Sequence, residues 1–285
     1  ANHGTGPLIS FSDIDGLDPR LRGALREANF QKPSPIQAHA VPLLLRGHDV
    51  MASAQTGSGK TVMFALPMLQ RLLASSSPKR RETSSPAGRS TEAARSAVNP
   101  RALVLSPTRE LAAQIANAAR QLAPEHETGL RVGLATGGEA SRAQRLELAK
   151  GCDVLVGTPG RVQQFVDERF VQLRACEQVV VDEADRMLDL GFEPQLRRIA
   201  RSLGPFSAAR QTALCSATFP PEVQRVASEF LKPDYYFVAA GKVGATHARI
   251  KQKLVWAGGG DAEKRALAVR EVRDFHGPPP PPSSS

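Results

Sequence analysis

The chain has 285 residues, which is enough for one large α/β domain or two modest ones. Its hydrophobic content of 41% supports a buried core, while an aromatic content of 5% predicts an interior built mainly from Ala, Val, Leu and Ile. The formal net charge of +9 suits a polyanionic partner such as a nucleic acid, although a basic solubilising surface would carry the same charge.

The composition indicates neither a membrane protein nor a metal site built from cysteines. No apolar run approaches the roughly 20 residues that a transmembrane helix requires, and the first ten residues lack the basic and apolar regions of a signal peptide. The cysteines, Cys152, Cys176 and Cys215, are scattered without the spacing of a zinc site or a disulfide framework. We therefore expect no membrane partner, and free cysteines that act as small buried hydrophobes in a reducing compartment.

Short apolar runs alternate with helix-like stretches between about residues 50 and 240. Such runs are typical of strands in a parallel sheet that helices cover on both faces. Proline near the first helical position marks helix starts at Pro19, Pro35 and Pro221. The sequence thus predicts an α/β fold with a doubly wound, mostly parallel sheet, and the expected strands are residues 50–53, 102–106, 131–135, 153–157, 178–182, 212–216 and 235–239.

Two segments depart from this pattern. Residues 75–99 are rich in Ser, Pro and Arg, so we expect a disordered low-complexity insertion, either a basic loop that adds affinity for nucleic acid or a tolerated surface loop. The pattern weakens after Val243, and the chain ends in a polyproline tail. We predict an N-terminal extension at 1–16, a main domain at 17–247, and a linker with the start of a second domain at 248–285.

The run from Ala54 to Thr61 has the context of a phosphate-binding loop, because it follows an expected strand and opens a helix. Gly57 and Gly59 allow backbone N–H groups to converge on phosphate oxygens, Lys60 would reach the β and γ phosphates, and Thr61 would bind Mg²⁺. Ala54 departs from the strict pattern, which has Gly there. The predicted ATP-binding residues of this loop are Ala54, Gln55, Thr56, Gly57, Ser58, Gly59, Lys60 and Thr61.

An acidic pair ends the strand expected at 178–182. Asp182 could hold Mg²⁺, partly through water, and Glu183 could polarise an attacking water. Alone, such a pair is more often a helix cap, but its pairing with a phosphate-binding loop favours nucleotide hydrolysis. We therefore predict Lys60, Asp182 and Glu183 as catalytic residues, with Thr61 and Asp182 as the Mg²⁺ ligands.

Five motifs in order resemble those of the DEAD-box helicases. They are AQTGSGKT at 54–61, PTRELAAQ at 107–114, TPGR at 158–161, DEAD at 182–185 and SAT at 216–218. The resemblance extends over residues 11–254 and implies a RecA-like P-loop NTPase domain. It also implies an ATP-dependent RNA helicase that binds ATP, Mg²⁺ and single-stranded or duplex RNA, and that couples ATP hydrolysis to local unwinding or clamping.

Residues Phe30 to Gln37 resemble the Q motif, which reads adenine in that family. Phe30 offers a face on which adenine can stack, and the Gln37 amide can both donate and accept at the base edge. Lys32 joins these predicted ATP-binding residues, in place of a frequent Arg. Phe11 matches an upstream aromatic of the family, although for Phe11 alone we favour plain core packing.

The resemblance assigns further residues to RNA and to coupling. Helix N-termini, Arg side chains and bare backbone amides suit the sugar-phosphate backbone, so binding would not depend on base sequence. The predicted RNA-binding residues are Pro107, Thr108, Arg109, Glu110, Gly137, Gly138, Thr158, Pro159, Gly160 and Arg161. The predicted coupling residues are Asp185, Ser216, Ala217 and Thr218, joined by hydroxyl hydrogen bonds to Asp185, although these hydroxyls could instead cap the next turn.

Residues 240–256 look like the inter-domain linker of the Vasa and Belle group, which implies a cytoplasmic location, or shuttling to the nucleus, and translation or ribonucleoprotein partners. Family members also carry a second RecA-like domain with an arginine-rich motif, which we do not find here. An arginine finger is worth about 10³–10⁵ in rate, so we expect this chain alone to hydrolyse ATP slowly. The alternatives are a non-catalytic RNA-binding or regulatory fragment, and a DNA repair helicase of the same superfamily.

Overall fold

The computed structural model describes residues 6–55, 57–75, 97–206, 209–240, 260–261, 263–267 and 270. The chain divides into two compact units, residues 1–245 and 246–285. Most of the predicted insertion at 75–99 and of the predicted linker and tail lies outside the described residues. In the second unit, residues 263–267 are helical.

A seven-stranded parallel sheet forms the centre of the first unit within its described residues, in the order β3-β4-β2-β5-β6-β1-β7. Each strand coincides with one of the apolar runs of the sequence, which confirms the predicted α/β fold. The strands are β1 (Val50–Ser53), β2 (Ala102–Leu105), β3 (Val132–Ala135), β4 (Val154–Gly157), β5 (Gln178–Val181), β6 (Gln211–Ser216) and β7 (Tyr236–Ala239).

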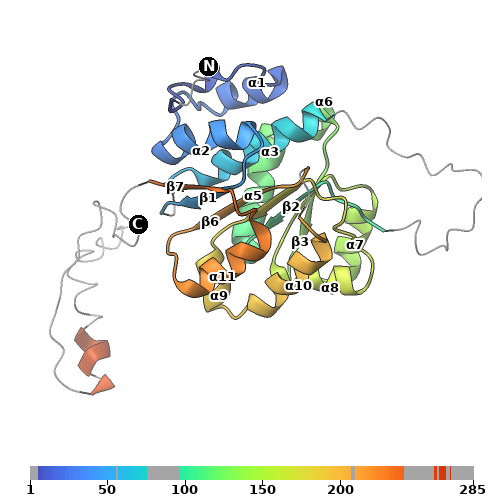
Figure 1. Cartoon of the computed structure of the whole chain (residues 1–285). Coiled ribbons are helices and arrows are strands. Elements are labelled where there is room, and N and C mark those ends of the chain that lie inside the picture. Colours follow the sequence, from blue (N-terminus) through green and yellow to red (C-terminus); the bar gives the residue numbers. More distant parts are fainter. Residues whose placement is uncertain are drawn as a thin grey trace, which may run out of the picture. The chain divides into compact units, whose positions relative to one another are not determined.

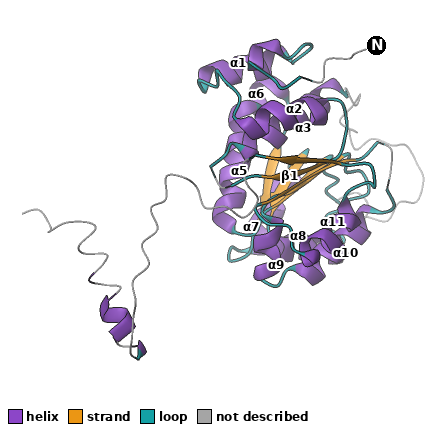
Figure 2. Ribbon diagram, turned by 60° about the vertical axis from the view of Figure 1, so that its left-hand side comes forward, coloured by secondary structure: helices purple, strands orange, loops and turns teal. Residues whose placement is uncertain are grey.

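Helices cover both faces of this sheet (Figures 1 and 2). Because β1, β2, β4, β5 and β6 are buried along their whole length, their side chains supply two apolar clusters, one on each face. One face carries α2 (Pro35–Leu45), α3 (Lys60–Ala74) and α5 (Arg109–Leu122). The other carries α7 (Ser141–Ala149), α8 (Pro159–Asp167), α9 (Ala184–Asp189), α10 (Glu193–Leu203) and α11 (Pro221–Phe230).

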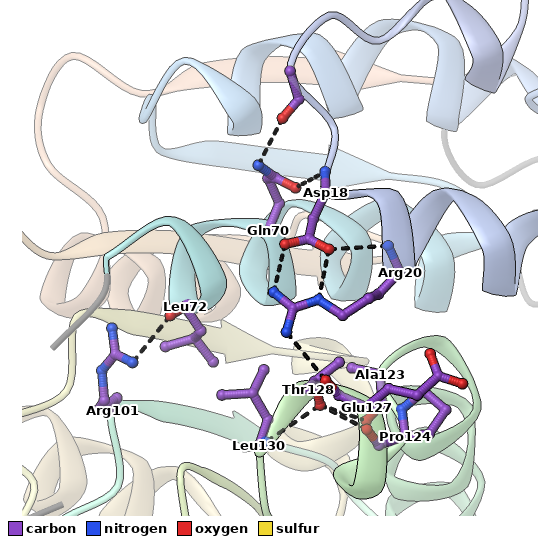
Figure 3. Close-up of polar contacts among 11 residues, drawn as sticks. Asp18, Arg20, Gln70, Leu72, Arg101, Ala123, Pro124, Glu127, Thr128 and Leu130 are labelled. Atoms are coloured by element: carbon purple, nitrogen blue, oxygen red, sulfur yellow. Dashed lines mark hydrogen bonds and ion pairs between the residues drawn. The ribbon is translucent and has the colours of Figure 1, made fainter. Parts of the chain in front are cut away.

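The N-terminal segment packs onto the helical layer of α3 and α5. Phe11, in the short helix η1 (Phe11–Asp13), and Ile14 are buried in the same core as the residues that follow, so the boundary predicted at residue 17 lies inside a packed segment. Helix α1 (Pro19–Glu27) begins at Asp18, whose backbone N–H donates to Gln70 of α3 at 2.8 Å. Figure 3 shows this contact and the bond from Arg20 to the Glu127 carbonyl of α6 (Glu125–Thr128).

The parallel arrangement has one consequence for function. All seven strands end at the same edge of the sheet, so the segments that follow β1, β5 and β6 meet the segments that follow β2, β3 and β4. In open α/β sheets, ligands bind beyond the carboxyl ends of the strands. Every motif singled out in the sequence, apart from the Q motif, lies at or just after the carboxyl end of one of these strands.

The cysteines lie in or near the core. Cys152, Cys176 and Cys215 are free; two are buried and Cys152 is half-buried. Burial raises the pKa of Cys152 and Cys176 to about 12, so both thiols stay protonated at neutral pH. Within the described ranges, no helix has the length and apolar character needed to cross a membrane.

Candidate nucleotide and RNA site

The loop after β1 has the backbone of a phosphate cradle. Gly57 and Gly59 adopt φ values of +79° and +91°, a region that residues with a side chain rarely enter. Gly59 precedes the first turn of α3 and offers no side chain to cap it, so the N–H groups of that turn remain available to an anion. Ala54 is buried, and Gln55 and Thr61 are half-buried. Thr56 lies outside the described residues.

Lys60 is the first residue of α3 and lies beneath this loop. It is only 7% exposed, and its Nζ donates to the Ala54 carbonyl at 2.6 Å, which curls the loop over the ammonium group. The positive charge of Lys60 also acts on Asp182 at the end of β5. The structure therefore brings together the cation and the acid that the sequence analysis selected on separate strands.

The segment that resembles the Q motif holds the phosphate loop by hydrogen bonds from Ser34 and Gln37. The Gln37 side-chain amide donates to the Gly59 carbonyl at 2.9 Å and accepts from the Ser34 backbone at 2.8 Å, while the Ser34 hydroxyl donates to the Ser58 carbonyl at 2.6 Å. Gln37 is buried, at the N-terminus of α2. In this structure its amide binds the loop, a contact that the sequence analysis did not predict.

Phe30 lies apart from Gln37. It is 36% exposed and meets the buried Phe11 edge to face, with ring centroids 6.3 Å apart. Both rings line a cavity of about 370 Å³, together with Arg22 and Arg26. Phe11 packs as a core residue, as favoured from the sequence. Gln37 does not line this cavity, and Lys32 is exposed, so the structure does not gather the three predicted adenine contacts around it.

The acidic pair follows β5, as the sequence predicts. Asp182 is 3% exposed, and its carboxylate accepts a hydrogen bond from the Glu183 backbone at 3.1 Å. Burial raises the pKa of Asp182 to about 6, the Lys60 charge opposes that rise, and the Glu183 and Asp185 charges add to it. Glu183 sits before α9 with a φ of +53°, a strained conformation that turns the chain sharply at the strand end.

Asp185 and Thr218 join β5 to β6 beyond their ends. The carboxylate of Asp185 accepts hydrogen bonds from the Thr218 backbone and hydroxyl, both at 2.9 Å, which confirms the hydroxyl bond expected from the sequence. Ser216 accepts from the Asp185 backbone at 3.3 Å and donates to the Thr218 carbonyl at 2.7 Å. Ala217 is exposed between them. The segment after β6 is thereby tied to the segment that contains Asp182.

The RNA candidates after β2 and β3 also meet. Thr108 caps α5 by accepting from the Leu111 backbone at 3.2 Å, Pro107 is buried before it, and Arg109 and Glu110 are exposed at the helix start. Gly138 has a φ of +80°, and the Arg109 guanidinium lies so close to it that a Cβ there would clash. The loop after β3 therefore lies against the N-terminus of α5, the positive end of that helix, beside the exposed Arg109.

The segment after β4 completes this group. Thr158 precedes α8 without capping it, and its hydroxyl accepts instead from the Gly137 backbone at 3.4 Å. Pro159 is buried as the first residue of α8, and Gly160 is exposed beside it. Arg161 does not extend freely: its guanidinium donates to the Glu139 carbonyl at 3.0 Å and to Gln144 at 3.1 Å.

Three comparisons with known proteins bear on this geometry. Residues 34–226, which is more than half of the chain, match the family model described as DEAD/DEAH box helicase. The chain belongs to this family. It is 47% identical over 266 residues to "DEAD-box ATP-dependent RNA helicase 52A" from Oryza sativa subsp. japonica, covering 92% of this chain and 42% of that protein. The chain therefore spans less than half the length of this relative.

The fold comparison agrees with the family assignment. A crystal structure of a hypothetical ATP-dependent RNA helicase from Sulfolobus tokodaii superposes with a TM-score of 0.63 and 29% identity. The match covers 79% of this chain and 57% of that one.

The residues present fit the ATP and Mg²⁺ that this helicase family implies. The Ser58 hydroxyl is buried in the loop without a hydrogen-bond partner among the described residues, and a phosphate oxygen there would supply one. A carboxylate and a hydroxyl are hard oxygen ligands, which Mg²⁺ prefers, and Asp182 and Thr61 provide them. Lys60 and the N–H groups at the start of α3 complement the phosphate charge.

One residue that shapes the loop after β3, Gln144, was not among the residues predicted from the sequence. Gln144 on α7 is buried, and its amide binds the Thr136 carbonyl at 2.9 Å and the Glu139 carboxylate at 3.0 Å, so it fixes the loop that contains Gly137. A signal for it exists: Gln144 and the buried Leu148 are four residues apart and share one helix face. A polar residue on such a face commonly serves a neighbouring backbone.

Proposed function

We propose that this chain is the ATP-binding part of a DEAD-box ATP-dependent RNA helicase, which binds ATP with Mg²⁺ and the backbone of single-stranded RNA. The observation that carries this proposal is the meeting of two groups at one sheet edge. The phosphate loop, Lys60 and Asp182 follow β1 and β5, and the arginine and helix-terminus group follows β2, β3 and β4. Both groups are attached to strand ends of the same sheet, so a change at one group can reach the other through the sheet.

In the ATP site, each residue has a distinct task. The N–H groups of the phosphate loop and the Lys60 ammonium bind the phosphates, and the Gln37 amide holds the loop in shape. Thr61 and Asp182 would hold Mg²⁺, partly through water, and the bound ion would neutralise charge on the phosphates. Glu183, turned away from the strand direction by its positive φ, would orient and polarise the attacking water.

In the RNA site, the chain would bind phosphates without reading bases. The N-termini of α5 and α8 and the amides of Gly137 and Gly138 are suitable phosphate ligands, and the exposed Arg109 adds charge. Arg161 would act mainly by holding the loop after β3, because its guanidinium is engaged there. The bonds between Asp185 and Thr218 would transmit the state of the ATP site to β6 and so couple hydrolysis to local unwinding or clamping of RNA.

We further propose that fast hydrolysis requires a second RecA-like domain, which supplies arginine side chains to the γ-phosphate. This part rests on the family resemblance and on the general value of an arginine finger, about 10³–10⁵ in rate. A place in the Vasa and Belle group, a cytoplasmic location and translation or ribonucleoprotein partners are proposals on the same footing.

ATP turnover by the purified chain tests the proposal. We expect slow hydrolysis, weakly stimulated by a single-stranded RNA oligonucleotide and absent in the Lys60→Ala variant. Robust RNA-stimulated turnover that Lys60→Ala abolishes would contradict the need for a second domain. A DNA oligonucleotide that stimulates more strongly than RNA would favour a DNA helicase instead.

RNA affinity distinguishes the enzyme from a passive module. We expect binding of the oligonucleotide, measured by fluorescence anisotropy, to tighten when ATP and Mg²⁺ are present. The Arg109→Ala variant should weaken binding of every sequence to a similar degree, because a backbone contact carries no sequence information. RNA affinity that is the same with and without nucleotide, together with no turnover, would support a non-catalytic RNA-binding fragment.

A further inference from the structure

A row of polar residues crosses three neighbouring strands just beyond their ends. Leu105 of β2 is aligned with Gly157 of β4 on one side and with Val181 of β5 on the other. The next residues are therefore Thr158, Ser106 and Asp182, side by side, with neighbouring strands about 4.8 Å apart. Backbone bonds continue the ladder through this row, from Ser106 to the Gly157 carbonyl at 3.0 Å and from Asp182 to the Leu105 carbonyl at 2.9 Å.

The three side chains share one face of the sheet. Val104, Val156 and Val180, each two residues earlier in its strand, all pack in the apolar cluster on the α3 and α5 side. Side chains alternate along a strand, so residues two positions apart point to the same face. Ser106 therefore lies between the RNA-side Thr158 and the Mg²⁺-side Asp182, on the face from which Lys60 approaches.

The hydrogen bonding of the Ser106 side chain is unsatisfied in this position. It is 0% exposed, and its hydroxyl has no hydrogen-bond partner among the described residues. A buried hydroxyl without a hydrogen-bond partner destabilises the protein unless another state supplies a partner. Both neighbours can supply one: the Asp182 carboxylate has acceptor sites beyond the bond from Glu183, and the Thr158 hydroxyl, which accepts from Gly137, still has a proton to donate.

We propose that Ser106 is a positioning residue for the Mg²⁺-binding acid, donating a hydrogen bond to the Asp182 carboxylate and accepting one from the Thr158 hydroxyl. The inference rests on the proposed function, since it assigns Asp182 to Mg²⁺ and Thr158 to the RNA side. A fixed carboxylate binds its ion and the ion's waters better than a rotating one, as with other partners of metal ligands. The hydroxyl also gives the RNA-binding loops a direct hydrogen-bonded route to the ATP site.

Mg²⁺-dependent nucleotide binding tests this role. A fluorescent, non-hydrolysable ATP analogue is bound to the purified chain and titrated with MgCl₂, and thermal unfolding is followed in parallel without nucleotide. We expect Ser106→Ala to raise the Mg²⁺ concentration for half-saturation about tenfold. Binding in EDTA should not change. The melting temperature should stay equal or rise, because an unpaired buried hydroxyl is removed. If Ser106 had only a packing role, Ser106→Ala would not weaken the response to Mg²⁺ while leaving the melting temperature unaltered.

Further variants test the proposed chain of hydrogen bonds from Thr158 through Ser106 to Asp182. Ser106→Thr retains the hydroxyl and should restore most of the Mg²⁺ response. Thr158→Val should weaken it in the same direction, and the double variant with Ser106→Ala should be no worse than Ser106→Ala alone, since Thr158 reaches Asp182 only through the Ser106 hydroxyl. Thr212→Val removes another buried hydroxyl, at the opposite end of β6, and should lower stability without altering the Mg²⁺ response.

The outcomes separate the inference from the function on which it rests. An unchanged Mg²⁺ half-saturation in Ser106→Ala would overturn the positioning role, and so would additive effects of Ser106→Ala and Thr158→Val. In either case, Mg²⁺-dependent binding by the unaltered chain would leave the proposed function intact. If the unaltered chain binds no nucleotide at any Mg²⁺ concentration, the ATP site itself is wrong and the positioning role falls with it.

Discussion

The side-chain amide of Gln37 lies 2.9 Å from the carbonyl oxygen of Gly59, and this bond fastens the start of α2 to the phosphate loop. The contact depends on the absence of a side chain at residue 59. A Cβ there would lie 2.5 Å from the Gln37 nitrogen and 3.0 Å from the Ser34 hydroxyl. The positive φ and the close approach therefore both require glycine at this position.

We predict that Gly59→Ala destabilises the chain more than Gly57→Ala does. Both residues have a positive φ, so alanine should cost about 1–3 kcal/mol of backbone strain at either position. Only residue 59 adds a clash with Gln37, because an alanine Cβ at residue 57 would meet nothing within 4 Å. Urea unfolding without nucleotide should show an additional loss of about 1–3 kcal/mol for Gly59→Ala. Equal losses for the two variants would argue that the tie from Gln37 yields without cost.

A second prediction concerns the bond between Asp185 and Thr218. Thr218→Val removes the hydroxyl bond but leaves the backbone bond, so the unfolding free energy should fall by about 1 kcal/mol. A double-mutant cycle with Asp185→Ala should return a coupling of similar size. Nucleotide affinity should hardly change, because the lost bond joins the segments after β5 and β6 and not the phosphate loop. Ser202→Ala, which removes a hydroxyl bond on α10, serves as the control for a local loss of stability. A large loss of nucleotide affinity in Thr218→Val would instead make this pair part of the ATP site.

The fold and the positions of the phosphate loop and the acidic pair at strand ends could be predicted from local pattern. Each apolar run became a strand, and burial on both faces of the sheet explains the continuous apolar runs of β1, β2, β4, β5 and β6. The loop from Ala54 to Thr61 follows a strand and opens a helix, as its glycines indicate. The bond between Asp185 and Thr218 was expected only from the resemblance to the helicase motifs, because the pattern does not show that β5 and β6 are neighbours. These features depend on contacts close in sequence or on a known motif.

Strand order and lateral neighbours could not be predicted in this way. The position of Ser106 between Thr158 and Asp182 depends on β2 lying between β4 and β5, and periodicity reports faces but not order. The Gln37 contact with Gly59 was missed for a related reason. An amide suits adenine and a carbonyl equally well, so only the packing of α2 on the phosphate loop decides between them.

A third prediction concerns Asp49, which joins the starts of three strands. Its buried carboxylate accepts from the Thr212 backbone and the Lys232 backbone, both at 2.9 Å. Asp49→Ala leaves two amides without an acceptor, so the unfolding free energy should fall by about 3 kcal/mol. Asp49→Asn retains one acceptor and should lose less. The exposed Asp234 is the matched control, since Asp234→Ala should change stability by less than about 0.5 kcal/mol. Urea midpoints that are the same for the two alanine variants would contradict this account.

The last prediction is a pH dependence at the start of α1. Asp18 accepts from Arg20 Nη2 at 2.7 Å, from Nε at 2.8 Å and from the backbone at 3.0 Å (Figure 3). The Arg20 guanidinium lowers the pKa of Asp18 below its ordinary value of 3.8, against the opposing effect of burial. A carboxyl with a lowered pKa stabilises the folded state above pH 3.8, and that stability disappears as the pH falls through the lowered pKa.

Asp18→Asn isolates this charge, because Asn caps a helix as well as Asp does. At pH 7 the unaltered chain should be more stable than the variant by about 0.5–1 kcal/mol, a small value since Arg20 is partly exposed and solvent screens the pair. The difference should vanish towards pH 2 and shrink in 1 M NaCl. Denaturant unfolding of both proteins from pH 2 to pH 7 measures it. A difference that does not vary with pH would show that the pair contributes only the geometry of the cap and that the Asp18 charge adds nothing to stability.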